Sequence, residues 1–67
     1  MTTIQRLYVQ MYVYHINQAN VHVHLAAQAK RAGDVAAERK NQRTADAFRT
    51  LANEKLARFS ASREAMQ

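Results

Sequence analysis

The sequence predicts an all-α fold in which two long helices form an antiparallel hairpin. The chain of 67 residues has one Gly and no Pro, so few positions can break a helix or close the tight turns of a many-stranded sheet. Apolar side chains recur at helical spacing on both sides of a single break. That break, Ala32-Gly33-Asp34, carries residues that end one helix and begin another.

The first helix is expected over about residues 3–32. Positions 4, 7, 11, 14, 18, 21, 25, 28 and 32 follow the helical period, and seven of these nine are apolar. A strand alternative stays open, because the Val, Ile and Tyr residues here favour strands. In that alternative, residues 7–16 and 21–25 pair as a β-hairpin. Its turn would lack Gly, and residues 7–16 are apolar on both alternating faces, which favours the helix.

The turn is expected at residues 33–34 and the second helix over about residues 35–65. Gly33 can adopt the left-handed conformation that ends a helix, and the Asp34 side chain can accept hydrogen bonds from the free amides of the next one. Residues 35–65 are rich in Ala, Glu, Lys, Arg and Gln and contain no breaker. One stripe at helical spacing is expected to face the first helix, namely Ala37, Ala45, Phe48, Ala52, Leu56 and Phe59.

The short length predicts a single domain, residues 1–67, that depends on association with a second copy. A chain of this size lies near the lower limit at which one core offsets conformational entropy. The absence of Cys excludes a disulfide framework and a thiolate zinc site. No apolar run approaches the roughly 18 residues of a membrane span, and no convincing signal peptide is present. We therefore expect a cytoplasmic protein without membrane association.

The first helix is predicted to have two apolar faces. One is expected to pack against the second helix, and its members are Ile4, Leu7, Met11, Tyr14 and Leu25. The other would stay uncovered in a single hairpin, and its members are Val9, Val13, Ile16 and Val23. This second face is the predicted dimer interface, and dimerisation through it would make a four-helix bundle.

Binding, rather than catalysis, is the function that the sequence favours. No catalytic motif is present, and neither a metal site nor a cofactor is expected. The most specific signal is a row of residues along the boundary between the two apolar faces, and Tyr is enriched in binding hot spots. This row contains the candidate partner-binding residues Tyr8, Tyr12, His15 and His22. We expect a small homodimeric accessory protein of phage or bacterial type that binds and modulates, most simply inhibits, a regulator, transcription factor or motor component.

Two alternative functions remain. The net charge of +5 and the pI of about 10.3 are typical of nucleic-acid binding. The candidate contacts to RNA or DNA gather around the turn, and they are Lys30, Arg31, Arg39, Lys40 and Arg43. In architecture alone, such a hairpin resembles small RNA-binding helical hairpins. The second alternative is a structural subunit whose apolar face is buried in a larger assembly.

Overall fold

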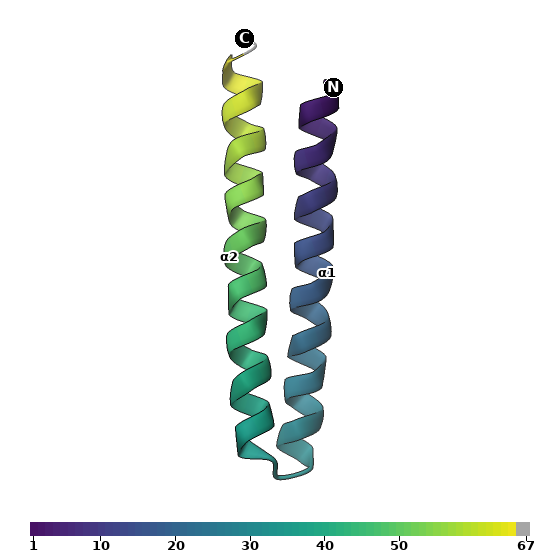
Figure 1. Cartoon of the computed structure of the whole chain (residues 1–67), viewed down its shortest axis with the longest axis vertical. Coiled ribbons are helices and arrows are strands. Elements are labelled where there is room, and N and C mark those ends of the chain that lie inside the picture. Colours follow the sequence, from purple (N-terminus) through teal and green to yellow (C-terminus); the bar gives the residue numbers. More distant parts are fainter. Residues whose placement is uncertain (66–67) are drawn as a thin grey trace.

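The computed structural model describes residues 1–65, which form two helices, α1 (Thr3–Arg31) and α2 (Val35–Ala65). The helices lie side by side and antiparallel, as a rod of 51 × 13 × 11 Å (Figure 1). The predicted all-helical hairpin is confirmed, and the helix bounds lie within one residue of those expected. The strand alternative is wrong, because residues 7–25 lie inside α1.

A capping box begins α1. The hydroxyl of Thr2 accepts a hydrogen bond from the backbone N–H of Gln5 at 3.1 Å, and the Gln5 side-chain oxygen accepts one from the backbone N–H of Thr2 at 2.9 Å. These two bonds satisfy amides that have no partner within the helix. Gln5 is also buried, as the first buried residue of α1.

The turn between the helices is a Schellman motif. Gly33 has a φ of +74°, its N–H donates to the carbonyl of Lys30 at 3.1 Å, and the N–H of Asp34 donates to the carbonyl of Ala29 at 2.9 Å. The carboxylate of Asp34 then accepts from the N–H of Ala37 at 3.0 Å and caps α2. Both predicted roles at the break are confirmed. The compact turn returns the chain directly onto α1 (Figure 1).

The two helices meet along a narrow contact, which we call the seam. In α1 the seam residues recur every three or four positions: Gln5, Tyr8, Tyr12, His15, Ala19, His22 and Ala26. In α2 they are Asn41, Ala45, Phe48, Ala52, Lys55 and Phe59. Only alanines form its buried apolar core, Ala19, Ala26, Ala45 and Ala52, and no large side chain of residues 1–65 is fully buried. The seam therefore resembles an antiparallel coiled coil with small residues at its centre.

The orientation of α1 about its own axis differs from the prediction. Every member of the face expected to pack against the second helix is exposed, with Tyr14 at 55% and Leu7 at 48%. That prediction is wrong, because the row that begins with Tyr8 and Tyr12 forms the contact instead. Relative to the prediction, α1 is rotated about its axis by about 100°, the angle between successive residues of a helix. Small alanines let the two backbones approach closely, whereas a row of Leu, Met and Ile would hold them apart. In α2 the stripe is confirmed at Ala45, Phe48, Ala52 and Phe59, but Leu56 is 46% exposed.

Candidate protein-binding surface

The apolar side chains left uncovered on α1 form two strips. Each residue of the first strip immediately precedes a seam residue, and this Leu7 strip contains Ile4, Leu7, Met11, Tyr14, Val21 and Leu25. Each residue of the second immediately follows a seam residue, and this Val13 strip contains Val9, Val13, Ile16 and Val23. Because an α-helix turns about 100° per residue, the strips lie on opposite flanks of the seam.

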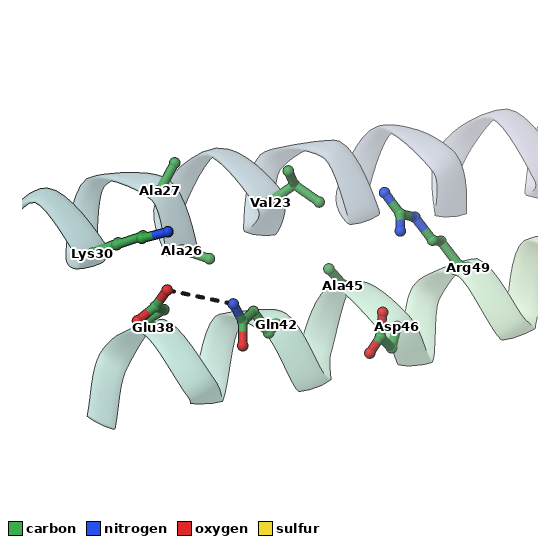
Figure 2. A pocket seen from close by; sticks show the side chains of 9 residues that line it. All are labelled: Val23, Ala26, Ala27, Lys30, Glu38, Gln42, Ala45, Asp46 and Arg49. Carbon is green, nitrogen blue, oxygen red and sulfur yellow. Dashed lines mark hydrogen bonds between the residues drawn. The ribbon is translucent and has the colours of Figure 1, made fainter. Parts of the chain in front are cut away.

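The flank that carries the Val13 strip is hollowed near the turn. An open hollow of about 510 Å³ lies between the helices, lined by Val23, Ala26, Ala27, Lys30, Glu38, Gln42, Ala45, Asp46 and Arg49 (Figure 2). Figure 2 shows Lys30 and Arg49 at its two ends, with Glu38 and Gln42 between them on α2. The Gln42 amide donates to the Glu38 carboxylate at 3.5 Å. The alanines make the floor of the hollow apolar, and its rim carries charges of both signs.

A smaller hollow lies on the same flank, toward the chain ends. It has a volume of about 90 Å³ and is lined by Tyr8, Val9, Tyr12, Leu56 and Phe59. The guanidinium of Arg63 lies 5.9 Å from the centre of the Phe59 ring, which places a cation beside this apolar hollow. The structure thus puts two of the predicted partner-binding residues, Tyr8 and Tyr12, half-buried in the seam and at the edge of an apolar hollow.

The other two predicted partner-binding residues, His15 and His22, are half-buried in the seam, and both rings lie near that of Phe48. The rings of His22 and Phe48 are nearly parallel, with centroids 5.8 Å apart, and the ring centroids of His15 and Phe48 are 6.1 Å apart. His22 Nδ1 is 2.9 Å from Asn41 Oδ1, and the Asn41 amide donates to the carbonyl of Ala37. Within residues 1–65, Nδ1 of His15 is buried without a hydrogen-bond partner. These contacts give both rings a role in holding the hairpin together.

The remaining predicted site residues are accessible. Val9, Val13 and Val23 are 36%, 48% and 43% exposed, and Ile16 is half-buried. The basic residues proposed for nucleic acid all lie exposed around the turn: Lys30, Arg31, Arg39, Lys40 and Arg43. In the described part of the chain, no group of three or more His, Cys, Asp or Glu side chains could hold a metal ion.

Comparisons of the chain with protein-family models, with curated proteins and with solved structures found no match. Function is therefore inferred from the surface of the molecule alone. Within residues 1–65, neither α1 nor α2 combines the length and the hydropathy that a membrane span requires. The surface features that stand out are the two apolar strips of α1 and the two hollows beside the Val13 strip. A third open hollow, of about 490 Å³, lies on the Leu7 strip, where Val21 and Leu25 help to line it.

Proposed function

We propose that the chain is a non-enzymatic, homodimeric helical hairpin that binds and modulates another protein, such as a bacterial regulator, transcription factor or motor component. The observation that carries the proposal is that α1 keeps apolar strips exposed on both flanks after α2 has packed against it. Fully burying one large apolar side chain contributes about 1.5–3 kcal/mol. The buried apolar core of the hairpin consists of four alanines, so covering these strips would add substantially to its stability.

The flank that carries the Val13 strip is the proposed site for the partner protein. Its two hollows can receive side chains, and the tyrosines at the smaller one have the apolar ring and polar tip that are enriched in hot spots. Lys30, Arg49 and Arg63 outnumber the acidic residues Glu38 and Asp46 along this flank. The fitting partner is therefore a segment with apolar anchors, such as Leu or Phe, flanked by carboxylates.

Nucleic-acid binding through the basic residues around the turn is the alternative that the test must separate. Phosphate contacts release counterions, so binding through Arg39, Lys40 and Arg43 would weaken steeply with salt. Binding in an apolar hollow depends less steeply on salt, because burying apolar side chains releases no condensed counterions and only the few rim charges are screened. The two modes therefore use different residues and respond differently to ionic strength.

Affinity capture from bacterial lysate, with and without nuclease treatment, tests the proposal, with wild type and two variants side by side. The variant Tyr12→Ala/Leu56→Gln alters the smaller hollow, and the matched variant Arg39→Gln/Lys40→Gln/Arg43→Gln alters the basic turn. A partner captured by wild type and by the turn variant is purified and titrated, and Leu56→Gln alone is expected to weaken its binding at least ~10-fold. Capture that requires intact nucleic acid, or that only the turn variant abolishes, would contradict the proposal.

A further inference from the structure

The Leu7 strip has the period of a coiled-coil contact. Its positions 4, 7, 11, 14, 18, 21 and 25 are spaced three and four residues apart, and Gln18 is the one polar residue among them. This is the repeat that the sequence shows most strongly, yet α2 does not cover it, since Ile4 is 60% and Val21 50% exposed. The helix α1 thus carries two coiled-coil contacts, and only the seam is occupied within the hairpin.

From this second contact we infer that the Leu7 strip binds the Leu7 strip of a second copy of the chain, with the two α1 helices antiparallel. The inference rests on the homodimer of the proposed function and specifies its interface and orientation. In this arrangement the Leu7 strip, in place of the Val13 strip, is the dimer interface. The Val13 strip and its hollows then stay free for the partner protein. Leu51 of α2 extends the interface, because it too precedes a seam residue and is 39% exposed.

The exposed area of the strip matches what a stable dimer needs. A homodimer interface of standard size removes about 800 Å² from each partner, and about 65% of it is apolar, or roughly 500 Å². The side chains of the strip are 39–60% exposed. A large side chain presents roughly 150–200 Å² when fully exposed, so six of them present on the order of 500 Å². A patch of this size lies at the upper end of what monomers expose.

The charge distribution permits contact with a second copy and favours the antiparallel orientation. From Leu7 to Ala29 the sequence contains no Asp, Glu, Lys or Arg, so two such surfaces meet without repulsion although each chain carries +5. The basic residues Lys30 and Arg31 begin just beyond this uncharged stretch, at the turn. Parallel pairing would bring the two basic turns together. Antiparallel pairing puts them at opposite ends of a rod 51 Å long, far beyond the screening length of about 8 Å.

Antiparallel pairing sets the neighbours along the interface. The two-fold axis passes near Tyr14 and Gln18, at the middle of the strip. Met11, Leu7 and Ile4 on one side of the axis then face the partner residues on the other side, Val21 and Leu25. At 1.5 Å per residue, the two copies of Ile4 lie on the order of 30 Å apart, whereas parallel pairing would place them beside each other.

Single-cysteine crosslinking tests this arrangement directly, because the sequence contains no Cys. With a thiol crosslinker of about 10 Å reach, or two helical turns, Tyr14→Cys is expected to form covalent dimers. Ile4→Cys alone and Leu25→Cys alone should stay uncrosslinked, but a mixture of the two should crosslink. Val13→Cys, which replaces a neighbouring exposed residue on the other flank, is the matched control and should not form covalent dimers. Circular dichroism checks that every variant keeps its helices.

The result also separates this inference from the proposed function. Sedimentation equilibrium is run in parallel on wild type, Met11→Glu and Val13→Glu. Met11→Glu should raise the dimer dissociation constant at least ~100-fold, because a carboxylate would be buried without a partner, and Val13→Glu should leave it unchanged. If wild type is dimeric but Val13→Cys forms covalent dimers, the proposed interface is wrong. If wild type is dimeric but Ile4→Cys crosslinks with itself, the antiparallel orientation is wrong. A wild type that is monomeric at all concentrations overturns the dimer itself.

Discussion

The helices α1 and α2 have nearly the same length, 29 and 31 residues, but very different outer surfaces. Each contributes one row of residues to the seam. Outside the seam, α1 exposes nine large apolar side chains and has no charged residue from Leu7 to Ala29. In α2 only Val35, Leu51 and Leu56 are large, apolar and exposed, and most of the charged residues of the chain lie in this helix.

This difference separates what holds the hairpin together from what the hairpin presents to other molecules. The seam uses small or half-buried residues from both helices. Most of the exposed apolar surface lies on α1, where we propose that one strip binds a second copy and the other binds a partner protein. The polar α2 keeps the outer side of the molecule hydrated. The following changes break or sharpen this division, in order of decreasing effect.

The seam should tolerate no added volume. Ala52 is 0% exposed, so in Ala52→Leu the larger side chain must push the helices apart, and we expect a loss of about 3 kcal/mol in the free energy of unfolding. Ala57→Leu, at an exposed position on the outer side of the same helix, should change it by less than about 0.5 kcal/mol. Chemical denaturation at matched protein concentrations measures both. Equal losses would mean that the alanine contact does not hold the hairpin together.

The two flanks should respond differently to the same polar substitution. Leu25 and Leu56 are similarly exposed, at 39% and 46%, but lie on opposite flanks. Leu25→Gln should weaken the dimer by about 2 kcal/mol, because a large apolar side chain is lost from the proposed interface. Leu56→Gln should leave the stability of the dimer unchanged and weaken only the binding of the partner protein. Sedimentation equilibrium of the two variants decides between the flanks, and an equal effect on the dimer would show that they are not distinct.

His15 should be a weak point of the seam. Its Nδ1 is buried without a hydrogen-bond partner within residues 1–65, so His15→Phe should add about 1 kcal/mol to the free energy of unfolding while keeping a ring beside Phe48. His24→Phe is the matched control, because His24 is exposed and its Nε2 lies 3.2 Å from the side-chain nitrogen of Gln28 on the same helix. Thermal unfolding of both variants measures the difference. A loss of stability in His15→Phe would show that the imidazole itself is needed.

Substitution of Gly33 in the turn should lower the free energy of unfolding by a small amount, without any steric clash. Gly33 has a φ of +74°, and a Cβ at this position would meet no atom within 4 Å. Gly33→Ala should therefore cost about 1 kcal/mol, which is the conformational penalty of the left-handed region alone. Ala32→Gly, one position earlier in right-handed conformation, is a control for added backbone freedom. A cost well above ~2 kcal/mol for Gly33→Ala would indicate that the turn is packed more tightly than the structure shows.

Local signals in the sequence were sufficient for the helices and for the break. Gly33 and Asp34 act through hydrogen bonds to residues within a few positions, and Ala45, Phe48 and Ala52 follow one helical stripe. The capping box of Thr2 and Gln5 was not anticipated, although its Thr-x-x-Gln spacing is a known signal for a helix start. The two flanks of α1 were recognised as apolar, but the face predicted to contact α2 is exposed.

By itself, the sequence determined that two helices form, where they begin and end, and that α1 has more apolar surface than α2 can cover. These properties follow from propensity, caps and period, which act between residues close in the chain. Only the tertiary structure decided which side of α1 faces α2. Hydrophobic periodicity favoured the Leu7 strip, since it counts large apolar residues. Close packing of two backbones instead favours alanine at the contact, and Ala19 and Ala26 could be matched to Ala45 and Ala52 only once the helices lay side by side.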